Sequence, residues 1–288
     1  MTILAATDLS EASRSALRYG HAFARALGQP LAVVSVAEIW ERDTRRLIES
    51  FDDGQVVARP EAVESVREFV ADTLGPNANV EVEVVVEHPP ATAIIDAARR
   101  LDAAMIVVGT SGHSRIGELF FGSTTSAVAR ESTLPVLAVP PQAVPDRLET
   151  ILAPVDLSDC SSKSLALAHQ LAQAFAARLI VLHASPVTTP AVSPPLVYIP
   201  ESTDEVRRAA EQRVHEMVIR EGLEDRADVR VEVSPPHAAI LHTVEDEHAD
   251  LVVMGTHARS GVEKFFLGST AERVLRDRTC PVVVLRGE

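Results

Sequence analysis

Short apolar runs alternate along the chain with longer segments of helical periodicity, and the whole order occurs twice. In the first half we expect strands over 3–7, 31–36, 80–86, 104–109 and 135–139 and helices over 11–27, 59–74, 91–101 and 123–131. In the second half we expect strands over 151–155, 178–183, 228–233, 251–255 and 281–285 and helices over 161–176, 204–220, 238–248 and 269–276. Strands that alternate with helices in this way form a mainly parallel sheet with helices on both faces. The predicted fold class is therefore α/β, with two tandem, open, five-stranded Rossmann-like sheets.

Two glycine strings mark the duplication. The first copy reads Gly109-Thr-Ser-Gly112 and, after nine further residues, Gly122-Ser123-Thr124. The second copy reads Gly255-Thr-His-Ala258 and then Gly268-Ser269-Thr270. Both parts repeat at the same offset of 146 residues, since 255 − 109 and 268 − 122 give the same number. Each copy follows an apolar run and precedes a predicted helix, which is where a parallel α/β sheet can receive a phosphate.

The residue types in this string suit an anion. Backbone N–H groups approach a phosphate closely where no Cβ stands in the way, and the first copy has glycine at three such positions. Ser123 and Thr124 add hydroxyl groups at the start of a helix whose N-terminus carries partial positive charge, and Val108 directly precedes the loop. The alternative is that Gly122-Ser123 only caps a helix. Capping alone does not explain the repeated spacing, so we favour a ligand site.

A second repeated string places an aspartate after the first strand of each half. Asp8 in Asp8-Leu-Ser10 returns as Asp156 in Asp156-Leu-Ser158, at an offset of 148 residues (156 − 8). An aspartate there can accept hydrogen bonds from ribose or adenine, or it can cap the helix that starts near residue 11. Asp8 and the glycine loop face one crevice only if the first and fourth strands are neighbours. That condition predicts the strand order 3-2-1-4-5.

With both strings in place, the chain resembles a tandem member of the universal stress protein family. The family's ATP-binding subgroup carries Gly-x-x-Gly, nine residues and then Gly-Ser/Thr, which the first half matches, and Asp8 and Val36 match the family's nucleotide-contacting aspartate and adenine-lining valine. The resemblance implies binding of ATP or a related adenine nucleotide, with Mg²⁺ as an optional companion. It also implies that residues 136–139 pair with 282–285 inside one chain, so that homodimerisation of the whole chain is a further option.

The second half departs from the family pattern. Ala258 replaces the second glycine, and its Cβ can block the approach of a phosphate. Ala184 stands where the first half has Val36. We therefore expect the first half to be the better nucleotide site. The second-half candidates, for which the evidence is weaker, are Asp156, Gly255, Gly268, Ser269 and Thr270.

Composition and charge limit the remaining possibilities. The proline-rich stretch at 140–145 predicts a linker, which gives domains 1–143 and 144–288, and the weakly patterned segments 38–58 and 186–202 predict loops. The net charge of −14 argues against nucleic acid as a partner, and the apolar runs are too short to span a membrane. Together with the lack of a leader pattern, this predicts a cytoplasmic protein. Cys280 is expected in the core, and Cys160 either there or at a helix start that lowers its pKa.

No motif predicts efficient catalysis. The chain has no Gly-x-Ser-x-Gly elbow and no Gly-x-x-x-x-Gly-Lys-Ser/Thr loop, and the spacing of His237, His242 and His248 does not suit a metal site. Loop residues His113, Arg115, His257, Arg259 and Lys264 can reach phosphate oxygens or be solvated. The leading hypothesis is a stress-response protein that binds an adenine nucleotide as a regulatory ligand. The rivals are a nucleotide-free scaffold or partner-binding protein, a slow Mg²⁺-dependent ATPase and another enzyme acting on a nucleotide.

Overall fold

The computed structural model describes residues 1–37, 48–52, 55–58, 60–87, 89–110, 122–144, 148–185, 203–256, 267–277 and 279–287. In the first half the elements are β1 (Thr2–Thr7), α1 (Glu11–Leu27), β2 (Leu31–Ala37), β3 (Ile48–Asp52), β4 (Gln55–Ala58), α2 (Pro60–Leu74), β5 (Val80–Val86), α3 (Pro90–Arg100), β6 (Ala103–Gly109), α4 (Ser123–Glu131) and β7 (Val136–Val139). In the second half they are β8 (Thr150–Val155), α5 (Asp159–Phe175), β9 (Arg178–Ala184), α6 (Thr203–Arg220), β10 (Asp228–Glu232), α7 (Pro236–Asp246), β11 (Leu251–Thr256), α8 (Ser269–Asp277) and β12 (Val282–Arg286).

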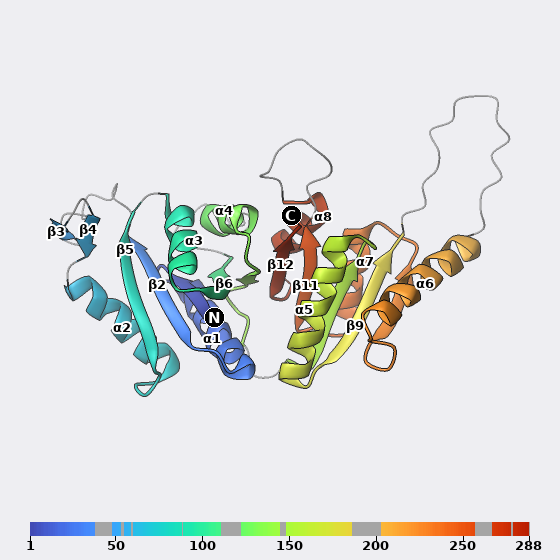
Figure 1. Ribbon diagram of the computed structural model, residues 1–288, viewed down its shortest axis with the longest axis horizontal. Helices are drawn as coiled ribbons and strands as arrows, with labels where there is room; N and C mark the ends of the chain where they lie inside the picture. Colours follow the sequence, from blue (N-terminus) through green and yellow to red (C-terminus); the bar gives the residue numbers. More distant parts are fainter. Residues whose placement is uncertain are drawn as a thin grey trace, which may run out of the picture.

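The main strands form one sheet of ten, in the order β10-β9-β8-β11-β12-β7-β6-β1-β2-β5 (Figure 1). Each half contributes five parallel strands in the predicted order 3-2-1-4-5. The predicted division into two separate sheets needs correction, because the halves join edge to edge. The weakly patterned segment 38–58 contains two strands that were not expected, since β3 and β4 pair there as a two-stranded antiparallel sheet. The other weakly patterned segment, 186–202, lies outside the described residues.

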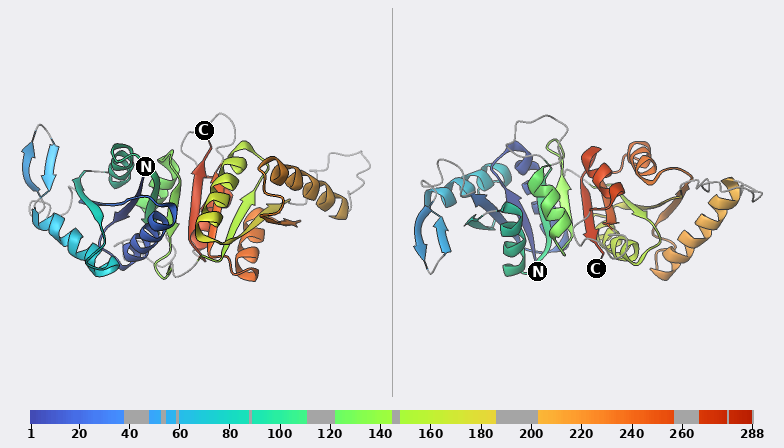
Figure 2. Two further views of the ribbon diagram at one scale, coloured as in Figure 1. Left: turned by 60° about the horizontal axis from the view of Figure 1, so that its bottom comes forward. Right: turned by 90° about the horizontal axis from the view of Figure 1, so that it is seen from above.

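The halves join through their last strands, as the resemblance implied. β7 and β12 run antiparallel, with Leu137 opposite Val283 and Val136 opposite Val284. Figure 2 shows these two strands side by side at the centre of the molecule in both views. Each strand covers the edge that the other would otherwise expose, and an exposed apolar edge promotes association between chains.

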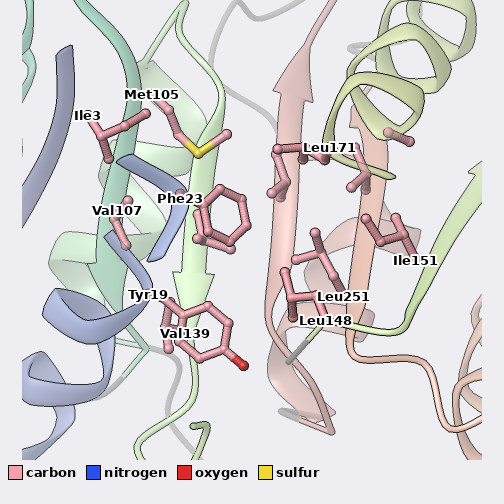
Figure 3. Close-up of a cluster of buried hydrophobic side chains, with 14 of the residues drawn as sticks. Ile3, Tyr19, Phe23, Met105, Val107, Val139, Leu148, Ile151, Leu171 and Leu251 are labelled. Carbon is pink, nitrogen blue, oxygen red and sulfur yellow. The ribbon is translucent and has the colours of Figure 1, made fainter. Parts of the chain in front are cut away.

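The hydrophobic core continues from one half into the other on each face of the sheet. On one face, α1, α2, α5 and α6 cover a single buried cluster, and on the opposite face α3, α4, α7 and α8 cover a second one. Figure 3 shows the first cluster, with Phe23 and Val139 of the first half across from Leu171 and Leu251 of the second. Phe23 also contacts Phe175 of α5, with ring centroids 5.0 Å apart. The two halves therefore share core packing as well as a strand pair.

One ion pair between a helix end and an edge strand occurs in both halves, although the residue types that form it differ. In the first half Arg100 at the end of α3 pairs with Glu83 of β5. In the second half Arg230 of β10 pairs with Asp246 at the end of α7, at 3.3 Å. The residues stand at equivalent positions, so the pair has exchanged its charges between the copies.

In the part of the chain that the structure describes, no helix has the length and apolarity that crossing a membrane requires.

Candidate functional site

The first-half candidates lie at the carboxyl edge of the sheet. β1 is hydrogen-bonded to β2 on one side and to β6 on the other, all in parallel, so their carboxyl ends meet at this edge. The helices that follow β1 and β6, α1 and α4, pack on opposite faces. The winding direction therefore reverses between β1 and β6, which is where open α/β sheets bind ligands. The structure brings to this edge Asp8, Val36, Val108, Gly109, Gly122, Ser123 and Thr124.

Asp8 stands in a tight turn between β1 and α1. Its Oδ1 accepts hydrogen bonds from the Ser10 N–H at 3.0 Å and the Ser10 hydroxyl at 2.5 Å, while the carboxylate is exposed. The helix cap is Ser10 and not Asp8, because the Ser10 side chain accepts from the Ser13 N–H. Leu9 between them has φ of 62°, a left-handed conformation that is costly for leucine. Leu157 repeats it in the second half, with φ of 66°.

Gly109 has a packing role in the structure. A Cβ there would lie 3.0 Å from the Ala12 carbonyl oxygen and 3.2 Å from its carbon, so the first turn of α1 passes directly over the end of β6. At Gly255 a Cβ would lie 2.6 Å from the Cys160 Sγ. Close helix-strand approach therefore explains the first glycine of both strings, whether or not a ligand binds.

The N-terminus of α4 is open. Gly122 occupies the cap position, and no side-chain cap to the first-turn amides occurs among the described residues. The helix start is fixed to β6 on its other side, because the Gly122 N–H donates to the Thr110 carbonyl at 2.9 Å and the Thr125 hydroxyl donates to the Gly109 carbonyl at 2.5 Å. Ser123 is exposed and Thr124 is half-buried. A fixed, uncapped helix start with hydroxyl groups beside it can bind an anion.

Thr110 is a polar residue at this edge that sequence reasoning missed. It is 2% exposed, and within the described residues its Oγ1 has no hydrogen-bond partner. The equivalent Thr256 hydroxyl donates to the Leu285 carbonyl at 3.2 Å. A buried hydroxyl without a partner is costly and calls for an explanation. The only sequence signal was that a threonine follows the first glycine in both copies.

Part of the predicted site lies outside the described residues. This applies to the glycine that distinguishes the first half, Gly112, and to its second-half counterpart Ala258. It also applies to the loop residues proposed as phosphate contacts, which are His113, Arg115, His257, Arg259 and Lys264. The described geometry therefore defines the strand ends of the candidate site and the start of α4.

The second half repeats the same edge with different side chains. Asp156 Oδ1 accepts hydrogen bonds from the Ser158 N–H at 3.2 Å and from the Ser161 hydroxyl at 2.5 Å. The structure places Gly255 at the end of β11, and Gly268, Ser269 and Thr270 at the start of α8. His183, at the end of β9, places its Nδ1 2.8 Å from the Val155 carbonyl.

Cys160 corrects one sequence-based alternative. It is 2% exposed, and its Sγ lies 3.7 Å from the Leu285 carbonyl oxygen. Burial raises the pKa of the Cys160 thiol, so the alternative of a lowered pKa at the helix start is wrong. Burial also raises the pKa of Cys280 to about 12. Both cysteines are core residues.

Other kinds of site find little support in the described ranges. There, no group of three or more His, Cys, Asp or Glu residues is arranged to hold a metal ion. Shallow hollows among the described residues include one of about 730 Å³ between α6 and β10 and one of about 380 Å³ between α1 and the turn after α2. Both lie away from the carboxyl edge of β1 and β6.

Comparison with known proteins identifies the family. The model of the universal stress protein family matches residues 1–140 and again residues 147–286. A universal stress protein of Mycolicibacterium smegmatis is 31% identical over 235 residues, which cover 78% of this chain and 76% of that protein. A universal stress protein of Thermus aquaticus is 34% identical over 138 residues, which cover 48% of this chain and 98% of that protein.

A solved structure agrees with this assignment over the full length. The crystal structure of a universal stress protein from Archaeoglobus fulgidus DSM 4304 superposes with a TM-score of 0.72 at 27% identity, covering 99% of this chain and 98% of that one. Because the family model matches both halves, the duplication seen in the strings is a duplication of the family's domain. The chain belongs to the universal stress protein family, as a member with two such domains in tandem.

Proposed function

We propose that the first half binds ATP or a related adenine nucleotide as a regulatory ligand in a cytoplasmic stress response. One observation carries the proposal: the start of α4, which has no side-chain cap among the described residues, lies beside a buried Thr110 hydroxyl that has no partner there either. An anion at the helix start gives the first-turn amides a partner, and a ligand or bound water there can do the same for the hydroxyl. The acidic chain would then hold an anionic ligand by local geometry.

The phosphates would lie at α4, and the nucleoside along the ends of β1 and β2. Ser123 and Thr124 supply hydroxyl groups to the phosphates together with the first-turn amides, and Gly112 supplies a further amide from the loop. Mg²⁺ would enter with the nucleotide and would neutralise part of the phosphate charge. Asp8 accepts hydrogen bonds from the ribose or the adenine amino group. Val36 supplies apolar surface for the base, and Val108, which is 3% exposed, contributes its backbone at the end of β6.

The second half is proposed to bind nucleotide weakly or not at all. Ala258 adds a Cβ to the loop, and Ala184 offers less apolar surface than Val36. In addition, the Thr256 hydroxyl already donates to a backbone carbonyl, so this hydroxyl needs no ligand to satisfy it. We propose a domain boundary between residues 143 and 144, in the proline-rich linker. We also propose that whole chains can dimerise further.

Titration calorimetry of the full chain with MgATP tests the proposal, using Asp8→Asn and Asp156→Asn as a matched pair. Asparagine keeps an oxygen that can accept from Ser10 or Ser158, so the turn survives while the charge is removed. Loss of a hydrogen bond to a charged group costs about 1.5–3 kcal/mol, so the first substitution is expected to weaken binding by roughly 10- to 100-fold. The second should leave the affinity within about twofold. No heat with wild-type protein, or equal effects of both substitutions, would contradict the proposal.

Two alternatives give different results in the same experiments. A nucleotide-free scaffold, supported by Ala258 in the second half, would purify without adenylate and bind none at millimolar concentration. A slow Mg²⁺-dependent ATPase, or another nucleotide-dependent enzyme, would release product at a rate well above background, and Asp8→Asn would abolish that release. Mass spectrometry of protein purified without added ligand distinguishes the scaffold from the binder.

A further inference from the structure

We infer that the second half controls the nucleotide affinity of the first half through Arg286. This inference rests on the proposed function, because it assigns a regulator to the same site. Arg286 is a positioning residue here, since it contacts the far end of the helix whose start would hold the phosphates. By linkage, nucleotide binding in the first half should in turn stabilise the contact that Arg286 makes.

The contact crosses the boundary between the halves. The Nη1 of Arg286 donates a hydrogen bond to the carbonyl of Arg130 at 3.1 Å. Arg130 lies in the last turn of α4, and Arg286 is the last residue of β12. The antiparallel register explains the meeting, because Val284 of β12 lies opposite Val136, the first residue of the strand that follows α4.

A cation at this position acts on the helix favourably. The last carbonyl groups of a helix lack partners within the helix, and the C-terminus carries partial negative charge. A guanidinium that donates to one of these carbonyls satisfies it and complements the helix dipole. The donor comes from the other half of the chain, so the end of α4 is fixed relative to β12.

Both ends of α4 are thus held, and the second half contributes at the end. The start is fixed to β6 through the hydrogen bonds of Gly122 and Thr125, whereas the end is held by Arg286 together with first-half contacts, among them the hydrogen bond from the Ser132 N–H to the Val128 carbonyl. The helix has nine residues and a length of about 13 Å, so it moves largely as one rigid piece. A shift at its end therefore moves the first-turn amides, whose hydrogen bonds to an anion depend on distance and angle.

The position equivalent to Arg286 in the first half cannot make the reciprocal contact. At the offset of 146 residues, Arg286 corresponds to Pro140 (286 − 146) and Arg130 corresponds to Arg276 (130 + 146). Proline has no side-chain donor, so the first half cannot hold the end of α8 in this way. This asymmetry matches the difference between the two glycine strings. The first half keeps both Gly109 and Gly112, and it is also the half whose helix end accepts the hydrogen bond from Arg286.

The experiment compares Arg286→Ala and Arg286→Lys with the control Arg276→Ala, all in the full chain. Arg276 likewise lies in the last turn of a helix, α8, but it pairs with Glu272 of that same helix. Calorimetry with MgATP should give about 3- to 10-fold weaker binding for Arg286→Ala, within or near the usual range of coupling between sites. Lysine can donate to the same carbonyl, so Arg286→Lys should recover part of the loss. Arg276→Ala should bind as wild type does.

Hydrogen exchange supplies a readout that a purely structural role of Arg286 would not change. In wild-type protein, ATP should slow exchange in 282–286 of the second half as well as at the start of α4. In Arg286→Ala it should slow exchange only in the first half. If Arg286→Ala folds poorly, Arg286→Gln replaces it in the comparison with Arg286→Lys. Wild-type protein is then expected to bind MgATP most tightly, Arg286→Lys less tightly and Arg286→Gln least tightly.

The outcomes separate this inference from the proposed function. If wild-type protein binds ATP while the Arg286 variants keep its affinity and ATP leaves exchange in β12 unchanged, the inference is overturned and the proposed function stands. If wild-type protein gives no heat and no protection with ATP, the proposed function fails, and the inference fails with it. A loss of affinity in Arg276→Ala equal to that in Arg286→Ala would also overturn the inference.

Discussion

Replacing Gly255 with alanine tests how closely α5 packs on the end of β11. The new Cβ would lie 2.6 Å from the Cys160 Sγ and 3.1 Å from the Cys160 carbonyl oxygen. Cys160 is 2% exposed, and its Sγ already lies within 4 Å of two backbone carbonyls, so the side chain has little room to turn away. The helix must therefore shift.

The expected cost follows from two opposing effects. Overpacking of a core costs about 1–3 kcal/mol, whereas replacing glycine by alanine restricts the unfolded chain and returns about 0.4–1 kcal/mol. We expect Gly255→Ala to reduce the free energy of unfolding by roughly 2 kcal/mol net. The cost lies well above zero because the new Cβ would approach the Cys160 Sγ even more closely than the Cys160 carbonyl oxygen. Gly109→Ala should lose less, since its nearest contact is the Ala12 carbonyl oxygen at 3.0 Å.

A double-mutant cycle isolates the thiol. Cys160→Ala removes the Sγ but leaves the carbonyl, which reproduces the Gly109-Ala12 arrangement of the first half. In that background Gly255→Ala should cost about 1 kcal/mol less than in wild-type protein, as expected for residues in direct contact. Chemical denaturation followed by circular dichroism measures each free energy of unfolding. The reasoning is refuted if Gly255→Ala costs the same in both backgrounds or costs nothing in wild-type protein.

Three further predictions concern the shared core, the two buried cysteines and the titration of His21. Phe23→Ala should destabilise the whole chain by about 3–5 kcal/mol, with both halves unfolding in one transition. A Phe23-Phe175 cycle should give about 0.5–1.5 kcal/mol of coupling, and two separate transitions would contradict the shared core. Ellman's reagent at pH 8 should label neither Cys160 nor Cys280 in native protein but both in denaturant, and fast native labelling would refute the buried assignment. Burial, and then the charge of Arg25, lower the pKa of His21 in the folded state below 6.5. As the pH falls, His21 therefore binds a proton in the unfolded state before it does so in the folded state. Stability should therefore be level above pH 6.5 and fall below it, and His21→Gln should reduce that fall.

The sequence predicted the fold because nearly every element has its own periodic signal. The helix expected over 11–27 is α1, and the duplicated strings placed the first and fourth strands side by side. Periodicity says nothing about which strand edges meet, so the pairing of β7 with β12 followed only from the resemblance, and the single ten-stranded sheet was not predicted. The segment 48–58 lacks clear alternation, and the β3–β4 hairpin was missed for that reason.

The site was harder to predict than the fold. Gly109 satisfies a packing requirement, and the ligand role proposed for it depends on the same missing Cβ, so a sequence cannot separate the two. The Thr110 hydroxyl became a candidate only through its burial and its lack of a partner among the described residues. The contact of Arg286 with α4 depends on the pairing of β7 with β12 and joins residues 156 positions apart, so no local pattern predicts it.

A crystal structure of the full chain grown with ATP and Mg²⁺ tests the central claim most directly. The account predicts nucleotide in the first half, with phosphate oxygens within hydrogen-bond distance of the N–H groups of residues 123–125 and the ribose or adenine beside Asp8. Nucleotide in the second half alone, or a first-half crevice filled by its own side chains at saturating ATP, would contradict it.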